Sequence, residues 1–103
     1  MYKLVVFVPN SHLPKVQETV FNAGAGKIGK YDRCSFISEG FGTYHPLKGS
    51  KPFKGKIGKP EKVKELRLEV VVPKKLIKKV LRAMISVHPY EEPAYDVYPI
   101  LKV

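Results

Sequence analysis

The chain has 103 residues, 44% of them hydrophobic, and a formal net charge of +10 at pH 7. This length suits one hydrophobic core, so we expect residues 1–103 to form a single domain, which excludes a separate catalytic and substrate domain. The single cysteine excludes a disulfide framework and a thiolate zinc cluster, and the short apolar start predicts a strand rather than a membrane span, which favours a cytoplasmic location.

The first segments predict a strand followed by a helix. The β-branched run YKLVVFVP (Tyr2–Pro9) is typical of a central strand. Asn10 and Pro14 then favour a helix start, and an apolar stripe continues this helix to about Asn22.

The middle of the chain predicts an interrupted strand and a long loop. The segment RCSFISEGFGTYH reads as a strand with a bulge or bend at Gly40 and Gly42. A loop rich in Gly, Lys and Pro follows from Pro46 to Pro60.

The remaining segments complete a recognisable order. VKELRLEVVVP alternates apolar and charged residues from Val63 onward and predicts a strand. An amphipathic helix with a basic face is predicted from Lys74 to about Val87, and a strand over AYDVYPIL. The resulting β-α-β-β-α-β order predicts a ferredoxin-like α+β sandwich, with an antiparallel sheet in the order 4-1-3-2 and both helices on one face.

The pentapeptide GKIGK occurs at Gly26–Lys30 and again at Gly55–Lys59. The first copy overlaps a G-x-G-x-x-G pattern that begins at Gly24 and is typical of dinucleotide-binding loops. Those loops need a strand before the glycines and a helix after them, whereas Gly24 follows a predicted helix. We therefore predict a helix C-cap and turn for the first copy, and a loop that could carry function for the second.

The excess of positive charge raises the question of a nucleic-acid partner. No aromatic residues that could stack on bases are interleaved with the lysines of the predicted basic helix. The pattern therefore favours a solvated basic face over a nucleic-acid interface.

The three histidines are predicted to lie at one edge of the sheet. His12 follows the first strand, His45 ends the second and His88 ends the second helix, and the split βαβ topology brings these three ends together. The corner HPYEEP adds an aromatic residue and two carboxylates at the same edge, and its prolines restrict the backbone. The expected ligand-binding residues are His12, His45, His88, Tyr90, Glu91 and Glu92.

Imidazole and carboxylate groups also suit a divalent metal. The candidate metal ligands are His12, His45 and His88, and the candidate cofactor is a divalent ion. The alternative interpretation of HPYEEP is a rigid helix-to-strand corner with Tyr90 packed and the carboxylates solvated. Cys34 is expected to be a buried small hydrophobic residue rather than a nucleophile, because the histidines lie at the other end of the sheet.

Several long segments carry a resemblance to a known family: VPNSHLPKVQETVFNAGAGKIGKYDRCSF, GFGTYHP, KPFKGKIGKPEKVKELRLEVVVP and HPYEEPAYDVYP. They are similar to the inserted domain of YqfO-type proteins, the Nif-three-like family of dinuclear-metal hexamers that are often labelled as GTP cyclohydrolase type homologs. The resemblance covers nearly the whole chain and implies a stand-alone version of that insert. The insert is itself similar to the CutA and PII proteins, which implies a ferredoxin-like domain that associates as trimers.

The resemblance does not carry over the family's two metals, because their His, Asp and Glu ligands belong to flanking halves that we expect this chain to lack. The insert's own signature does carry over: His12, Gly24, Gly26, Gly29, Tyr31, Asp32, Cys34 and the run from His88 to Pro93.

Three functional hypotheses follow. The first is a small CutA/PII-like binding or regulatory module that engages a small ligand, a metal or a protein partner at one sheet edge. The second is a divalent-metal-binding protein that uses the three histidines. The third is a hydrolase-type enzyme, for which no catalytic residue is assigned. A homo-oligomer is also expected, with a trimer favoured, because one sheet face needs cover. The side chains expected to form the apolar area of that sheet face are Tyr44, Tyr95, Tyr98 and Ile100.

Overall fold

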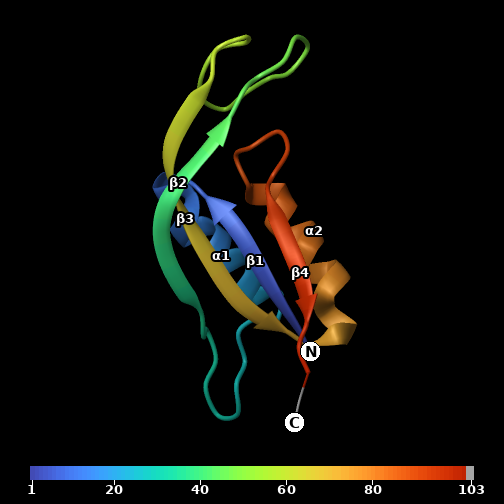
Figure 1. The fold of residues 1–103 in the computed structure, drawn as a ribbon. Helices are drawn as coiled ribbons and strands as arrows, with labels where there is room; N and C mark the ends of the chain where they lie inside the picture. Colours follow the sequence, from blue (N-terminus) through green and yellow to red (C-terminus); the bar gives the residue numbers. More distant parts are fainter. Residues whose placement is uncertain (102–103) are drawn as a thin grey trace.

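In the computed structural model, which describes residues 1–101, two helices cover one face of a four-stranded sheet (Figure 1). The elements, in chain order, are β1 (Tyr2–Val8), a 3-10 turn (Asn10–His12) that leads into α1 (Leu13–Asn22), β2 (Phe36–Tyr44), β3 (Glu61–Val72), a 3-10 turn (Lys74–Leu76) that leads into α2 (Ile77–Val87), and β4 (Tyr95–Pro99).

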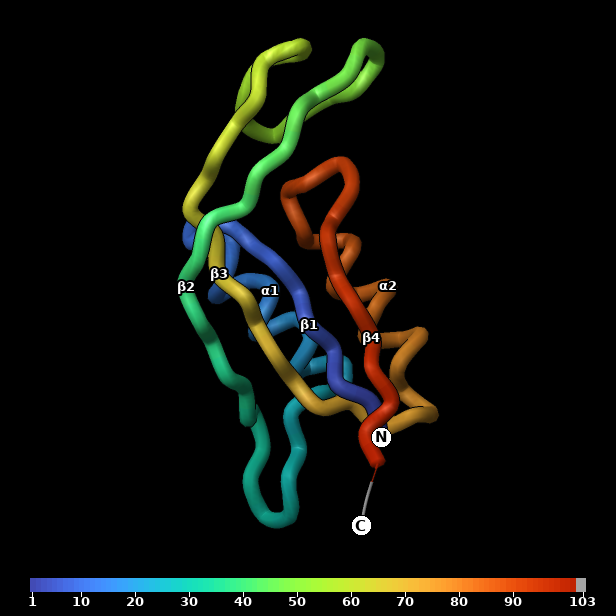
Figure 2. Tube along the Cα trace, viewed as in Figure 1, coloured from blue at the N-terminus to red at the C-terminus, as the bar shows by residue number. Residues whose placement is uncertain are grey.

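The sheet order is β2-β3-β1-β4, and each neighbouring pair is antiparallel. This is the predicted order 4-1-3-2 counted from the opposite edge, so the predicted fold is confirmed. Figure 2 shows the consequence for the chain path: β1 and β2 run upward, whereas β3 and β4 run downward.

The core lies between the sheet and the helices. Alternate residues of β1 and β3 point toward α1 and α2, and burying each such side chain contributes about 1.5–3 kcal/mol. Both helices contribute a short apolar stripe at helical spacing. The largest fully buried side chains of this core are Leu4, Val6, Val8, Val16, Val20, Leu68, Val70, Val72, Val80 and Met84.

Of the two predicted alternatives for β2, a bulge or a bend, the structure has no bulge. β2 pairs with β3 residue for residue along its whole length, with no inserted residue at Gly40 or Gly42. Glycine is favoured at position 42 by a close approach instead, since a Cβ there would come 2.0 Å from Oε1 of Glu65. The strand curves without a break in its ladder (Figure 1).

Two predicted side-chain directions are also wrong. Apolar and charged residues were predicted to alternate from Val63 onward, but the odd and even positions of Val63 and Leu66 put them on opposite faces of β3. Tyr95 was predicted to cover the open sheet face together with Tyr98. Tyr95 instead pairs with Val6, a core residue, and therefore lies on the helix side of the sheet.

β3 is longer than β1, and this difference shapes the upper end of the molecule. Residues 66–72 of β3 pair with β1, whereas residues 61–65 pair with β2 alone. The resulting two-stranded ribbon and its loop, residues 46–60, rise above the rest of the sheet (Figure 1).

The first GKIGK copy forms a helix C-cap and a turn, as predicted. Gly24 follows α1 with a φ of +112° and donates its N–H to the Phe21 carbonyl, while Ala25 donates to Val20. These two bonds form a Schellman motif. Ile28 and Tyr31 then exchange backbone hydrogen bonds around a tight turn.

Cys34 lies just before β2 at the lower end of the sheet. It is half-buried rather than buried, and its thiol donates to the Asp32 carbonyl at 3.6 Å. The expectation of full burial was wrong because this residue belongs to a surface loop and not to the strand. Within residues 1–101, no helix is both long and apolar enough to cross a membrane.

Candidate functional site

The β1–α1, β2–β3 and α2–β4 connections all lie at the upper end of the sheet (Figure 1). Aromatic rings from these connections are in contact. The ring of His12 meets Phe53 edge-on, with 5.6 Å between centroids, and Phe53 lies 6.0 Å from Tyr90. Tyr90 lies 4.8 Å from His88. Residues far apart in sequence thus form one continuous aromatic row.

His88 is buried and bonded through both ring nitrogens. Nε2 lies 2.8 Å from the Phe7 carbonyl, which can only accept, and Nδ1 lies 3.2 Å from the Tyr90 backbone N–H, which can only donate. These partners require the neutral ring with its proton on Nε2. Burial lowers the pKa of His88 below its usual 6.5, and nearby His12 adds to this shift. The Phe7 carbonyl and Glu65 act in the opposite direction.

Tyr90 connects the α2–β4 corner to β3. Its hydroxyl donates to Oε2 of Glu65 at 3.1 Å. Burial and the adjacent Glu65 carboxylate both raise the pKa of Tyr90, so the phenol stays protonated and remains the donor. The other oxygen of Glu65 lies against Gly42, where an added Cβ would push the carboxylate aside.

Glu91 connects the same corner to the 46–60 loop. Its Oε1 accepts a hydrogen bond from the Lys51 backbone N–H at 2.9 Å. The loop is also bonded to the end of β2, because the Tyr44 hydroxyl donates to the Lys54 carbonyl. These bonds hold two loops, separated by 40 residues, side by side.

A cavity of about 400 Å³ lies between these two loops and the upper part of β2. Such a volume is typical of small-molecule sites. Of the predicted site residues, His45, Tyr90, Glu91 and Glu92 line it. His12 and His88 do not line it, but their rings contact the lining residues Phe53 and Tyr90. The remaining lining residues are Gly42, Thr43, Tyr44, Pro46, Leu47, Ser50, Pro52, Phe53, Glu65 and Ala94.

The histidines do not form a metal centre by themselves in this arrangement. Among residues 1–101, no group of three or more His, Cys, Asp or Glu side chains is placed to hold a metal ion. Both ring nitrogens of His88 already have backbone partners, so neither has a free lone pair for a metal. The Ser11 hydroxyl lies 2.8 Å from Nδ1 of His12.

Sequence reasoning did not identify Phe53, Glu65 or Gly42 as residues of this end. Phe53 is an aromatic residue inside a loop rich in Gly, Lys and Pro, which is a usable signal. Before Glu65 the buried apolar residue of β3 is at an odd-numbered position, and after Glu65 the buried residues are at even-numbered positions. The prediction of a clean alternation did not use this change. Tyr44 was assigned to the oligomer surface instead.

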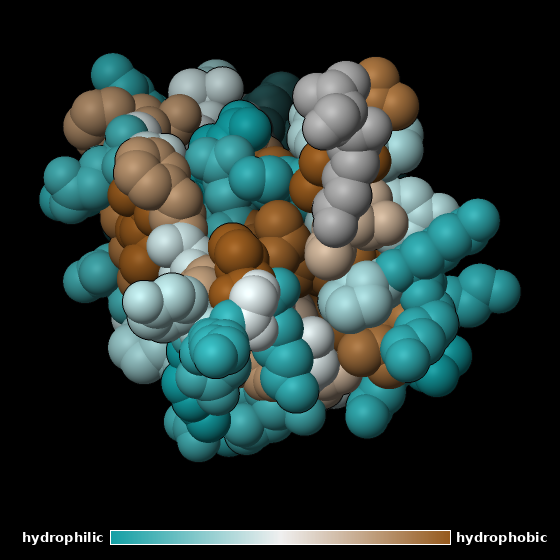
Figure 3. Space-filling model, turned by 90° about the horizontal axis from the view of Figure 1, so that it is seen from below, coloured by the Kyte–Doolittle hydropathy of each residue, from teal (hydrophilic) through white to brown (hydrophobic). Residues whose placement is uncertain are grey.

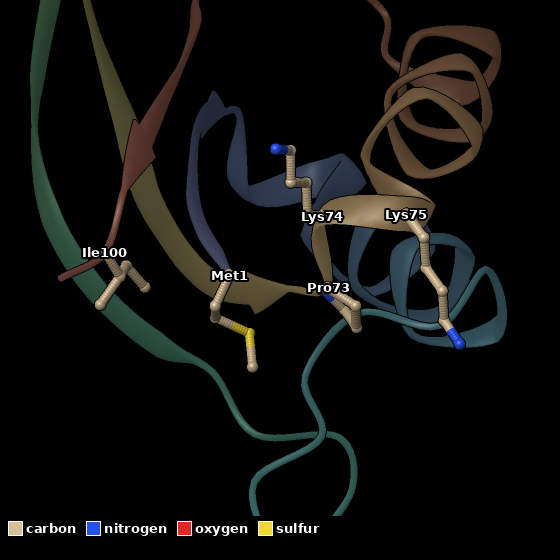
Figure 4. Close-up of a pocket in the computed structure, with 5 residues that line it drawn as sticks. All are labelled: Met1, Pro73, Lys74, Lys75 and Ile100. Carbon is tan, nitrogen blue, oxygen red and sulfur yellow. The ribbon is translucent and has the colours of Figure 1, made fainter. Parts of the chain in front are cut away.

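A second hollow, of about 530 Å³, lies at the opposite end of the molecule. Figure 3 looks onto this end and shows apolar side chains surrounded by hydrophilic ones. It is lined by Met1, Pro73, Lys74, Lys75 and Ile100, and the two lysine side chains point away from each other (Figure 4). Without converging polar groups, it is a weaker candidate for a ligand site.

The chain is similar to one part of larger bacterial proteins. It is 53% identical over 98 residues to a GTP cyclohydrolase 1 type 2 homolog of Bacillus subtilis, a match that covers 95% of this chain and 26% of that protein. The solved structure of a Bacillus cereus protein related to NIF3 is 47% identical, with a TM-score of 0.83, over 96% of this chain and 25% of the other. The chain thus spans about a quarter of the length of these relatives. No family model matches it.

The fold has a wider distribution. The PII-like protein CutA from Nostoc has a TM-score of 0.70 at 18% identity, over 97% of this chain and 81% of that one. At this low identity, the match supports the CutA/PII-like fold alone.

Proposed function

We propose, on the premise that this chain corresponds to one domain of the Nif-three-like proteins, that it is a small binding module. Its ligand would occupy the cavity between the 46–60 loop and the α2–β4 corner, which we call the upper pocket. We assign no catalytic role to this domain, and we propose that it works in the cytoplasm as a homo-oligomer, with a trimer as the favoured assembly.

The observation that supports this proposal most directly is the construction of the upper pocket. The 46–60 loop is bonded to the α2–β4 corner by the Lys51 backbone N–H, which donates to the Glu91 carboxylate, and the corner is bonded to β3 by the part-buried Tyr90 hydroxyl, which donates to Glu65. Loops held in a defined shape by such bonds are typical of binding sites rather than of simple connections.

A blocked-pocket variant tests this function. Ala94→Trp places a large ring at the pocket wall, and Ile28→Trp places the same ring at the exposed lower turn as a matched control. A panel of nucleotides, divalent metals, amines and carboxylates is titrated calorimetrically into the unmodified chain. The proposal expects at least one compound to bind the unmodified chain and the control, but not Ala94→Trp. Equal binding to all three proteins would place the site elsewhere.

The divalent-metal alternative rests on the shared location of His12 and His45 near the upper end. Because His88 uses both ring nitrogens internally, this alternative requires further ligands from another subunit. His12→Ala and His45→Ala should then each weaken zinc binding, while His88→Ala should lower the melting temperature. Loss of zinc binding only in His88→Ala would contradict this assignment.

The hydrolase alternative derives only from the name of the relatives, and the chain spans about a quarter of their length. We keep it as the third proposal. Its test is turnover of GTP by the purified chain, compared with Ala94→Trp.

A further inference from the structure

The charged side chains in the wall of the upper pocket are all acidic. They are Glu65, Glu91 and Glu92, and no lysine or arginine is among the described residues that line it. The chain as a whole has 19 lysines and arginines against 9 acidic residues. The charge of the pocket is therefore opposite to that of the protein, and it attracts cations locally.

The Glu65 carboxylate lacks a compensating charge. The Tyr90 hydroxyl donates to it, and Gly42 lies beside it. In the described part of the chain, the ion pairs join Lys64 to Glu39 and Arg67 to Glu69, so none of the three pocket glutamates is neutralised by a side-chain ammonium or guanidinium. A carboxylate that is partly removed from water without a counter-charge favours a cationic ligand.

The aromatic residues of the wall complement this charge. Tyr44, Phe53 and Tyr90 line the pocket from the end of β2, the 46–60 loop and the α2–β4 corner. Aromatic ring faces attract ammonium and guanidinium groups, and the attraction strengthens where water is excluded. Leu47 and Pro52 add apolar surface that would suit a hydrocarbon stem.

We infer that the upper pocket binds a small organic cation, an ammonium or guanidinium group on an apolar or aromatic stem. This inference rests on the proposed function and names its ligand class. Glu65 pairs with the cationic head, the three aromatic rings surround it, and Leu47 and Pro52 contact the stem. Phosphate-bearing ligands are disfavoured because the three glutamates repel them.

Three probes of nearly equal shape test the charge requirement: phenethylamine, 2-phenylethanol and phenylacetate, with ATP as a fourth. Calorimetric titration into the full chain at neutral pH should show binding of phenethylamine. 2-Phenylethanol should bind at least about tenfold more weakly, since hydrogen bonds to charged groups exceed neutral ones by about that factor. Phenylacetate and ATP should not bind.

Glu65→Gln removes the charge but keeps an oxygen that can accept from Tyr90. Its matched control is Glu18→Gln on the exposed face of α1. Glu65→Gln should weaken phenethylamine binding about tenfold in a chain that stays folded, and Glu18→Gln should leave binding unchanged. Equal binding of the amine and the alcohol, or equal affinity in both variants, would overturn the inference.

The outcomes also separate the two proposals. Binding of ATP or phenylacetate alone, lost in Ala94→Trp, would overturn the cationic ligand class and leave the binding function intact. If neither these probes nor the broader panel binds, both proposals fail.

Discussion

His88 lies between two backbone groups that determine its protonation state. The Phe7 carbonyl needs a donor and the Tyr90 N–H needs an acceptor, so a second proton on the ring would set two donors against each other. The ring therefore resists protonation in the folded protein and accepts a proton freely in the unfolded chain. His88 thus makes folding sensitive to acid.

We expect the free energy of unfolding to fall as the pH drops through 6.5, the ordinary pKa of histidine. Well above 6.5 the histidine is neutral in both states, whereas below 6.5 the unfolded state binds a proton that the folded state does not. The loss reaches at most about 1.4 kcal/mol per pH unit. Urea unfolding measures it, and His88→Gln should be less stable at the higher pH yet lose less on acidification. An equal loss in both proteins would contradict the role given to His88.

Gly42 allows a test of the contact between β2 and the Glu65 carboxylate. Gly42→Ala places a Cβ 2.0 Å from Oε1 of Glu65, while Gly40→Ala in the same strand meets nothing within 4 Å. We expect Gly42→Ala to be about 1–2 kcal/mol less stable than Gly40→Ala, because it displaces the carboxylate that accepts from Tyr90. Chemical denaturation of the pair measures the difference. Equal stabilities would show that Glu65 moves aside at no cost.

At the scale of elements, the end of α1 depends on a residue without a side chain. Gly24→Ala should cost about 2–3 kcal/mol, because an L-residue is strained at φ +112° and its Cβ would lie 2.6 Å from Leu76. Gly29→Ala is the matched control, with φ +58° and nothing within 4 Å, and should cost about 1 kcal/mol. Thermal unfolding compares the two. A larger loss at position 29 would contradict the role given to the Leu76 contact.

The order and type of the elements could be predicted because helical and strand periodicities are local properties of the sequence. The face that a strand residue occupies is different, since it depends on pairing with other strands. Tyr95 and Val63 were misplaced for this reason. Topology alone brought the histidine-bearing ends together. The composition of the 46–60 loop sets Phe53 apart, but its position depends on how this aperiodic loop folds back, which periodicity does not specify.

At the scale of the whole molecule, the structure is elongated. Its extents are 47 × 25 × 23 Å and its radius of gyration is 14.6 Å, against about 13 Å for a spherical domain of 100 residues. The ribbon at the upper end and the turn at the lower end account for this shape. The sheet face away from the helices leaves Phe36 65% and Tyr98 48% exposed.

We expect light scattering at micromolar concentration to give about three times the chain mass of 11.6 kDa. The open sheet face would supply the interface, because apolar side chains gain free energy when a neighbouring subunit covers them. Tyr98→Glu should shift the mass toward one chain, and Glu18→Gln on α1 should not. A single-chain mass for the unmodified protein would reject the trimer.

The unequal lengths of β3 and β1 have a consequence for how the protein opens. Residues 66–69 have a strand on either side, and residues 70–72 pair with β1 while the Val71 carbonyl accepts from the Gly26 N–H, whereas residues 61–65 have β2 alone. Hydrogen exchange should therefore occur in two tiers, with the ribbon opening at a lower free energy than the sheet beneath it. Since the upper pocket lies at the base of this ribbon, an occupant would slow exchange in residues 61–65 and leave residues 66–72 unchanged. The ribbon would then act as a hinged arm, and its amides would report whether the pocket is filled.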